Sequence, residues 1–383
     1  MSLLTPNHDD VFEVEPFCDD TALVDNSAVQ NVITGKITCS TRLRSLDGRN
    51  FIVIGCTDGL WVGQDSRSLR RVFHLKMVTQ CAMLDEHGVF LVLADKVLYA
   101  YHIQALVPSS AEMTIAMENP QRLGTRRASD VEFFRVGKQH NKTLVTYCMQ
   151  SKDGTDSIFR VVEALIPRLS EQTLEYFGSQ NGARDWFRVF RSFFSVFHSH
   201  DLAFLETKLV LMHKEGFEVL DPNDFRSFTL PRKEDSRYAS LAERWSSAVP
   251  LLMVKCTNNE FLLCYSNFGI YVDQHGDPNR LTSIVEWKGT AKQIALHRPY
   301  ILLFDPSFIE VRHIETGRLV QTIPGDNIRC LWDGINWNMS ANSPDGLDSE
   351  VRIHAVKSVV DPASGATVQR VFELIPKGLF SSG

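Results

Sequence analysis

The chain has 383 residues, 44% of them hydrophobic and 22% charged, so a buried core is expected and wholesale disorder is excluded. A net charge of -6 and a pI near 6.1 argue against a strongly basic nucleic-acid-binding domain. No apolar run approaches the roughly 18 residues that cross a membrane. The N-terminal sequence lacks the basic start and apolar stretch of a signal peptide.

Eight cysteines are spread along the chain without a C-x-x-C pair. Neither they nor the 12 histidines have the close spacing that a zinc site needs, so we predict no metal and no cofactor. Several cysteines lie in apolar runs, which is typical of buried, reduced thiols in a cytoplasmic protein. Their positions are 18, 39, 56, 81, 148, 256, 264 and 330.

Residues 51–63, FIVIGCTDGLWVG, predict the first clear element, a β-hairpin. The continuous apolar run before the turn is typical of a strand that is covered on both faces. Asp58 and Gly59 form the turn signal, because a tight hairpin turn needs a positive φ that glycine adopts without strain.

The same pattern of apolar run, turn and apolar run recurs along the chain. The last copy is interrupted by a polar insertion at residues 338–348. Including the first hairpin, the seven units lie at residues 51–63, 89–103, 143–165, 208–221, 260–276, 300–323 and 328–375.

Seven such units, spaced by roughly 40 to 60 residues, predict an all-β fold, a seven-bladed β-propeller with short helical insertions in the inter-blade loops. A pair of β-sandwiches or a helical solenoid are the alternatives, but the apolar pattern has a period close to two. For ring closure we expect the last strand, residues 368–375, to pair with an N-terminal strand at residues 37–43.

Residues 236–247, SRYASLAERWSS, predict a short amphipathic helix with Tyr238, Leu241 and Trp245 on one stripe. We interpret it as a loop helix between two blades that packs on the propeller.

Residues 185–197, DWFRVFRSFFSVF, are the most aromatic part of the chain. We favour the interpretation that they fill core space at the edge of a blade. The alternative is an exposed aromatic anchor of the kind that dominates protein interfaces.

Motifs of enzyme chemistry are absent from the sequence, which has no P-loop, no G-x-G-x-x-G opening a helix and no G-x-S-x-G. Three histidines next to strands are expected to be packed or surface residues, namely His102, His297 and His313. Most of the four acids near turns are expected to be turn formers; the four are Asp58, Asp95, Asp221 and Asp305. The single Trp-Asp dipeptide, at residues 332–333, argues against a WD40 propeller.

One short element has regulatory character. In residues 125–130, TRRASD, Ser129 follows Arg126 and Arg127 at a spacing that basophilic kinases accept. Phosphorylation of Ser129 would change the charge of a polar loop and with it docking. The alternative is a solvated loop with chance basic residues.

Three stretches together resemble the citron homology (CNH) domain, more closely the version at the C-terminus of fungal guanine nucleotide exchange factors for Rho-type GTPases. They are FIVIGCTDGLWVG at 51–63, EFLLCYSNFGIYVDQHG at 260–276 and FIEVRHIETGRLVQTIPG at 308–325. In the first stretch Gly55, Gly59, Leu60 and Trp61 stand where the family's opening blade has them. The resemblance extends over residues 30–376. It implies a propeller at 31–376, an N-terminal extension at 1–30 and a C-terminal tail at 377–383.

The resemblance further implies a non-catalytic protein-interaction module that docks a Rho-type small GTPase in cell-wall integrity and polarity signalling. The exchange factor's own catalytic region is a second partner to consider, whereas nucleic acid and direct membrane insertion are not expected. We expect a cytoplasmic protein, recruited to the plasma membrane at growth sites as part of a full-length exchange factor. Exchange activity would not reside in this domain, and the family offers no catalytic motif to carry over.

Three alternatives stay open. The module could belong to a Ste20-type kinase or a vacuolar tethering protein, or it could regulate the exchange domain within one chain. From a different class, a propeller glycosidase would need two carboxylates that converge on one bond.

Overall fold

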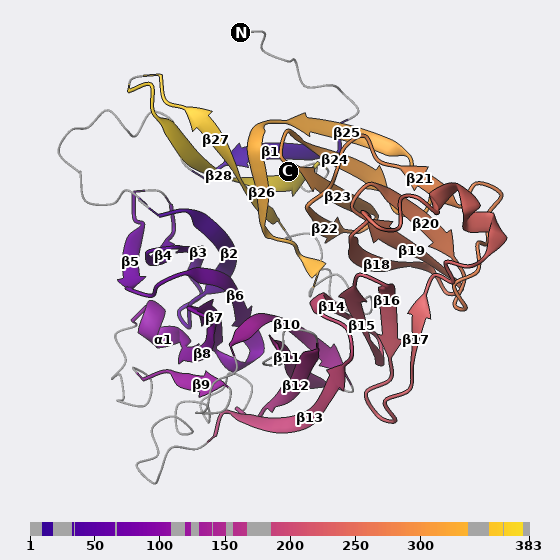
Figure 1. Cartoon of the computed structure of the whole chain (residues 1–383). Coiled ribbons are helices and arrows are strands. Elements are labelled where there is room, and N and C mark those ends of the chain that lie inside the picture. Colours follow the sequence, from indigo (N-terminus) through magenta and orange to yellow (C-terminus); the bar gives the residue numbers. More distant parts are fainter. Residues whose placement is uncertain are drawn as a thin grey trace. The chain divides into compact units, whose positions relative to one another are not determined.

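The computed structural model describes residues 10–17, 33, 35–65, 67–108, 119–123, 130–139, 141–150, 156–166, 185–335, 352–362 and 364–377. These residues form seven four-stranded antiparallel sheets, the blades of a β-propeller (Figure 1). The predicted all-β, seven-bladed fold is therefore confirmed. The blades belong to two compact units, one made of Phe17–His198 and the other of Met1–Pro16 with Ser199–Gly383.

The first unit contains three blades, numbered here in chain order. Their strands are β2 (Ile37–Arg44), β3 (Asn50–Cys56), β4 (Gly59–Gly63) and β5 (Arg70–Phe73) in blade 1; β6 (Val78–Leu84), β7 (Val89–Ala94), β8 (Val97–His102) and β9 (Gln121–Leu123) in blade 2; and β10 (Val131–Gln139), β11 (Lys142–Gln150), β12 (Ser157–Ala164) and β13 (Phe187–Ser195) in blade 3.

The second unit contains four blades. Their strands are β14 (Ser199–Leu205), β15 (Lys208–His213), β16 (Gly216–Leu220) and β17 (Ser227–Leu230) in blade 4; β18 (Pro250–Thr257), β19 (Glu260–Tyr265), β20 (Phe268–Val272) and β21 (Ile284–Glu286) in blade 5; β22 (Gln293–His297), β23 (Tyr300–Asp305), β24 (Phe308–His313) and β25 (Leu319–Pro324) in blade 6; and β26 (Asp326–Trp332), β27 (Ile353–Val360), β28 (Thr367–Pro376) and β1 (Phe12–Pro16) in blade 7.

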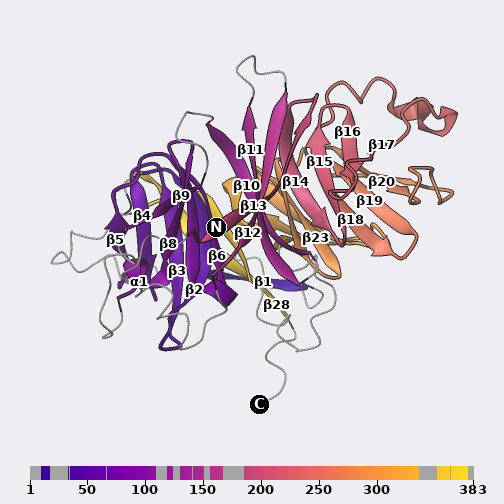
Figure 2. The ribbon, with the colours of Figure 1, turned by 90° about the horizontal axis from the view of Figure 1, so that it is seen from below.

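The predicted units coincide with the strands at the centre of each blade. Residues 51–63 form β3 and β4, and residues 208–221 form β15 and β16. Figure 2, turned by 90°, shows the strands of a blade running alongside one another. Central strands such as β7 are buried along their whole length, because both of their faces are covered. This accounts for their continuous apolar runs.

The turns of blades 1 and 2 are built in different ways. Our prediction that Gly59 is needed for a positive φ was wrong. Asp95 and Lys96, in the turn of blade 2, both have positive φ, 48° and 60°, which fits a hairpin with the usual strand twist. Gly59 does not adopt a positive φ. A Cβ atom there would lie 2.7 Å from the Phe73 carbonyl oxygen, so glycine is needed because β5 approaches closely.

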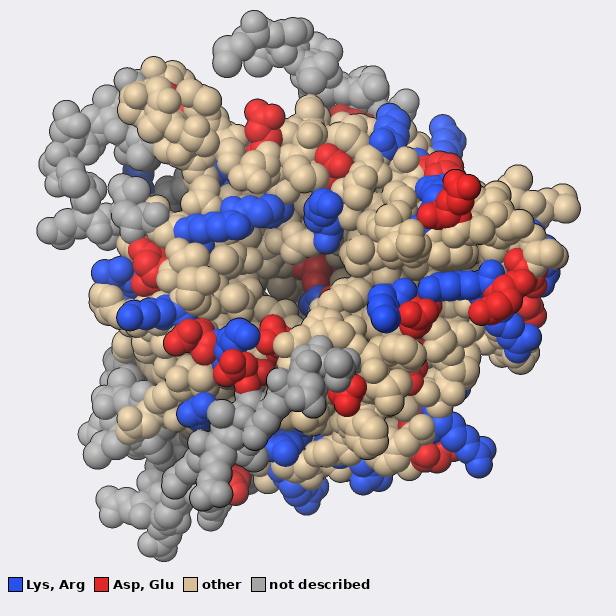
Figure 3. All heavy atoms as spheres, viewed as in Figure 1, with Lys and Arg blue, Asp and Glu red and all other residues tan. Residues whose placement is uncertain are grey.

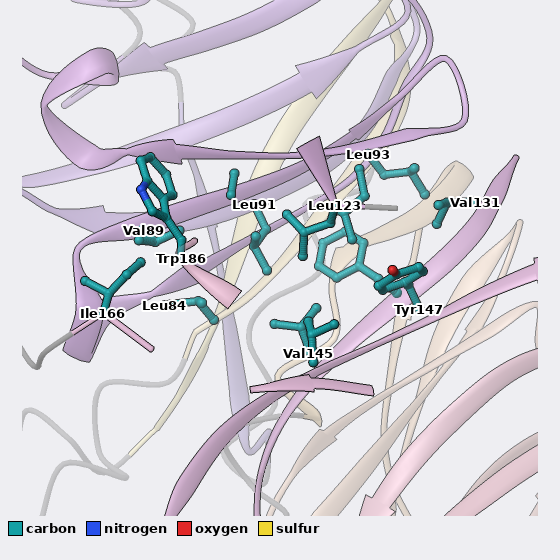
Figure 4. Close-up of a cluster of buried hydrophobic side chains, with 14 of the residues drawn as sticks. Leu84, Val89, Leu91, Leu93, Leu123, Val131, Val145, Tyr147, Ile166 and Trp186 are labelled. Atoms are coloured by element: carbon teal, nitrogen blue, oxygen red, sulfur yellow. The ribbon is translucent and has the colours of Figure 1, made fainter. Parts of the chain in front are cut away.

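The core lies between neighbouring blades. In the cluster shown in Figure 4, Val89 and Leu91 of β7 pack toward Val145 and Tyr147 of β11. Trp186, just before β13, closes one end of this cluster. Similar clusters join blades 1 and 2, 4 and 5, 5 and 6, and 6 and 7. Each blade thereby buries a face that it could not bury alone.

Glutamine side chains link two pairs of blades in the same way. The Gln80 carboxamide oxygen accepts a hydrogen bond from the Phe134 N–H at 2.8 Å, and Gln293 accepts one from the Cys330 N–H at 3.0 Å. In both cases the first strand of one blade holds the first strand of the next. Blades 2 and 3 are also linked at their last strands. There the Gln121 side chain of β9 accepts a hydrogen bond at 2.8 Å from the N–H of Trp186, just before β13.

Blade 7 takes its fourth strand from the N-terminus. β1 pairs antiparallel with β28 from Phe12 opposite Pro376 to Pro16 opposite Phe372. The Gln321 side chain of β25 fixes β1, because its oxygen accepts from the N–H groups of Val11 (3.1 Å) and Phe12 (2.9 Å) while its nitrogen donates to the Phe12 carbonyl (2.9 Å).

The predicted partner of the last strand was therefore wrong. β2, at Ile37–Arg44, begins blade 1, and β1 completes the last blade. Of the residues in β1 only Phe12 is buried, and the other four are exposed, so the strand has a weak apolar signal. It also lies within the stretch predicted as an N-terminal extension.

Short helical turns occur both between and within blades. The 3₁₀ helix η3 (Ser236–Leu241) connects blades 4 and 5, as predicted for residues 236–247. The 3₁₀ helix η2 (Asp85–His87) and the helix α1 (Ile103–Leu106) instead lie within blade 2.

The turn formed by η2 also reaches blade 3. The His87 ring contacts the Ile166 carbonyl oxygen at 2.7 Å and the Thr143 hydroxyl at 3.0 Å. Burial raises the pKa of the neighbouring Asp85 carboxyl to about 6. Gly88 ends the turn in the left-handed conformation, with φ of 61°.

Replacing Phe12 by alanine is expected to lower the free energy of unfolding by about 3 kcal/mol, because Phe12 is 2% exposed and packs edge-on against His297 and Tyr300. Denaturant unfolding at constant protein concentration measures the change. The control Val14→Ala, on the same strand but 38% exposed, should cost well under half as much. Equal effects of the two variants would contradict the observed anchoring of β1.

Asp85→Asn is expected to stabilise the protein at pH 7 by about 1–2 kcal/mol. The raised pKa means that the folded state binds more protons than the unfolded state between about pH 4 and pH 6. The stability contributed by neutral Asp85 is therefore lost as the pH rises through 6, and asparagine avoids this loss. Thermal unfolding of both proteins from pH 4 to pH 8 should show curves that meet near pH 4. A constant difference across this range would be inconsistent with titration of Asp85.

Candidate functional site

The three histidines considered as bases are packed in the fold. His102 is fully buried, its Nδ1 accepts a hydrogen bond from the Gln104 N–H at 3.3 Å, and burial lowers its pKa to about 4. The rings of His297 and His313 pack edge-on against Phe12 and Tyr300, respectively, with centroids 5.4 and 5.8 Å apart. These positions agree with the prediction that the three are packed residues.

Three of the four acids near turns serve the turns themselves. Asp305 accepts from the N–H groups of Ser307 (2.9 Å) and Thr290 (3.0 Å), and Asp221 accepts from the Asn223 N–H (2.8 Å). Asp58 lies 3.9 Å from the Arg71 guanidinium, and Asp95 occupies a positive-φ turn position. The predicted role as turn former is confirmed for Asp95, Asp221 and Asp305, whereas the Asp58 carboxylate contacts a side chain of β5.

The seven cysteines that the structure describes are all reduced and buried. Burial raises the pKa of the Cys56 thiol to about 12, which makes it a poor nucleophile at neutral pH. Within the described ranges no group of three or more His, Cys, Asp or Glu residues could hold a metal ion. No helix among those residues is long and apolar enough to cross a membrane.

The predicted regulatory element lies outside the described residues. This applies to Ser129 and to both arginines before it, Arg126 and Arg127. Its phosphorylation stays a prediction.

The connection between blades 4 and 5 forms a surface feature, which we call the insertion (residues 231–249). Asp235 caps η3 by accepting a hydrogen bond from the Arg237 N–H at 2.9 Å. The Tyr238 hydroxyl donates to the Gly276 carbonyl at 3.0 Å, and Tyr238 and Leu241 are buried. The half-buried Trp245 ring lies edge-on to Tyr265, as the predicted stripe requires.

Charged side chains surround the buried residues Tyr238 and Leu241, which we call the aromatic anchor together with Trp245. The Arg237 guanidinium lies 2.6 Å from Asp235 and 3.3 Å from Asp277, and the pair holds the pKa of Asp235 near 2. Arg244 binds both oxygens of Glu286, at 2.7 and 2.9 Å. Between these ion pairs the insertion exposes small residues, including Ala239 and Ser240. The insertion therefore exposes polar and charged side chains beside the buried residues that hold it on the blades.

The aromatic segment at residues 185–197 is partly buried and partly exposed, so the favoured interpretation as core holds for only part of it. Trp186 is 7% exposed and belongs to the cluster between blades 2 and 3, and the Phe193 ring stacks on Phe159. Its residues form β13, where Val189 is 56% and Phe194 is 74% exposed, and the following Val196 is 65% exposed. The arginines at positions 188 and 191 were the signal that could have shown this, because they interrupt any continuous apolar face. Phe194 is the aromatic residue of this segment that fits the alternative, an exposed anchor, and its role in an interface stays a prediction.

Charges of both signs are interspersed over the described face of the molecule shown in Figure 3. Lys and Arg side chains alternate with Asp and Glu without a broad patch of one sign.

Comparisons with known proteins agree with this architecture. The chain is 32% identical to Rho1 guanine nucleotide exchange factor 1 of Schizosaccharomyces pombe over 69% of this chain and 19% of that protein. It is 30% identical to Rho1 guanine nucleotide exchange factor 2 of the same organism, over 80% and 26% respectively. The chain thus spans about a fifth to a quarter of the length of these curated relatives.

Among solved structures, the AfRom2 CNH domain matches with a TM-score of 0.69 and 24% identity, over 94% of this chain and 98% of that chain. This likeness supports the fold. The family model of the CNH domain matches residues 48–334, which is most of the chain. The seven blades and this match together show that the chain belongs to the CNH domain family.

Proposed function

We propose that this domain is the non-catalytic interaction module of a Rho exchange factor and that it docks a Rho-type small GTPase. The observation that carries the proposal is that its relatives are Rho1 exchange factors, in which the matching region is a minor part of the chain. In that context the domain would serve cell-wall integrity and polarity signalling at the plasma membrane.

The insertion is the surface that we propose for docking. Its ion pairs and buried aromatic anchor order the exposed side chains before any partner arrives, which lowers the entropy cost of binding. A standard interface covers about 800 Å² on each partner, so it would extend beyond the insertion onto neighbouring loops of blades 4 and 5.

Titration of the purified chain with a Rho1-type GTPase, loaded with GDP or with a non-hydrolysable GTP analogue, is expected to give saturable binding with a preference for one nucleotide state. Isothermal calorimetry measures both affinities. Ala239→Arg, which places a long charged side chain on the insertion, should weaken binding about tenfold or more. Ala366→Arg, an equally exposed substitution in the loop between β27 and β28, is the matched control and should leave the affinity unchanged.

Absence of binding in both nucleotide states would refute GTPase docking. Unchanged affinity of the Ala239→Arg variant would mean that the GTPase binds this domain at a surface other than the insertion.

The chain alone is expected not to accelerate nucleotide exchange. Release of a fluorescent GDP analogue from the same GTPase should proceed within about twofold of its intrinsic rate. The reason is that exchange is expected to reside in the remaining part of the relatives' chains. A rate increase that is proportional to the concentration of the chain would contradict the non-catalytic role.

A further inference from the structure

The strand β13 differs from the other strands that end a blade. It has nine residues, whereas β5, β9, β17, β21, β25 and β1 have between three and six. One edge of β13 pairs with β12, and none of the strands in the described part of the chain pairs with its other edge. Figure 1 accordingly draws it as the last strand of blade 3. An edge of this length is a template for a further strand.

The two faces of β13 carry different chemistry. Val189 and Phe194 lie opposite Val162 and Ile158, which places them on the face that packs toward blade 2. Both side chains are more than half exposed, at 56% and 74%. Two exposed apolar side chains on an edge strand of this length are unusual, because such an edge favours pairing with a further chain.

Arginines occupy the other face. Arg188 lies opposite Glu163 and contacts its carboxylate at 2.9 Å, and Lys142 contacts the same carboxylate at 3.2 Å. Arg191 contacts no carboxylate among the described residues, and its guanidinium lies 4.9 Å from the centroid of the Phe190 ring. On this face the Glu163 carboxylate thus lies among three basic side chains, those of Lys142, Arg188 and Arg191. The face therefore has a local excess of positive charge and attracts acidic groups, although the whole chain has a net charge of -6.

This arrangement limits which partner can bind. A second copy of the chain that paired edge to edge would bring the arginines of both copies onto one surface, which like charges disfavour. A lipid surface would use the apolar and basic groups but not the hydrogen-bonding edge. An extended protein segment with alternating apolar and acidic residues matches the edge and both faces, because side chains alternate across a strand.

The fold already contains an addition of this kind. β1 joins blade 7 from a distant part of the sequence, and its residues alternate between acidic and apolar, Phe12-Glu13-Val14-Glu15. A bulge at Phe190, which has no residue opposite it on β12, divides the edge of β13 and limits how far an added strand can run.

We propose that β13 is a docking site for an extended acidic and apolar segment of a partner protein. The segment lies along the edge of β13 with which none of the described strands pairs, with acidic side chains toward Arg188 and Arg191 and apolar side chains against Val189 and Phe194. The site is separate from GTPase docking at the insertion, so either proposal can fail without the other.

A display library of random peptides of about ten residues, selected on the intact 383-residue chain, provides an unbiased test. The selected sequences are expected to alternate apolar and acidic residues. The best peptide is then synthesised with a fluorescent label, and fluorescence anisotropy measures its affinity. Phe194→Ser and Arg191→Glu should each weaken binding about tenfold or more.

The matched controls lie on blade 4. Phe228→Ser on β17, with Phe228 44% exposed, and Arg226→Glu beside it, with a side chain 89% exposed, should leave the affinity within about twofold. A peptide that is N-methylated at alternate residues, on the edge that would face β13, should lose binding because it lacks the donors for pairing. Thermal unfolding shows that each variant is folded.

Three results would overturn the proposal. The first is that no selected peptide depends on Phe194 and Arg191. The second is that the N-methylated peptide binds as well as the parent. The third is that anionic phosphatidylserine vesicles, and not peptides, bind in a manner that requires both residues, which would assign β13 to a membrane surface.

Discussion

Burial of apolar surface between neighbouring blades is the constraint on which the rest of this structure depends. A four-stranded sheet that is apolar on both faces gains little by itself, because at least one face would stay in water. Stacking solves this within each unit, through clusters such as that of Val89, Leu91, Val145 and Tyr147. The surface positions are thereby released from packing and are free to carry charge or recognition groups.

Stacking by apolar contact is not directional, and the glutamine side chains supply direction. A carboxamide that accepts a hydrogen bond from a backbone N–H of the next blade fixes one strand register against another. Gln80 and Gln293 act at the first strands, and Gln121 and Gln321 act at the last strands. Blades 2 and 3, and likewise blades 6 and 7, therefore share one mode of attachment.

The blade strands could be predicted from the sequence because their burial on two faces leaves continuous apolar runs, as in residues 51–63. β1 could not, because only Phe12 of its residues is buried. β13 was predicted only in part, because its aromatic content indicates burial whereas Arg188 and Arg191 indicate exposure, and the strand has residues of both kinds. Interaction surfaces leave little trace in one sequence, since exposed residues obey few packing rules.

The origin of β1 has a consequence for synthesis on the ribosome. The strand leaves the exit tunnel at an early stage, but the Gln321 side chain that holds it is 310 residues from Val11, and β28 is translated later still. Blades 1 to 6 can form in the order of translation, since each is a local set of strands. The first strand has to wait for β28 before it can form its pairing in blade 7, and its two glutamates place charge on the waiting strand, which disfavours pairing with other strand edges.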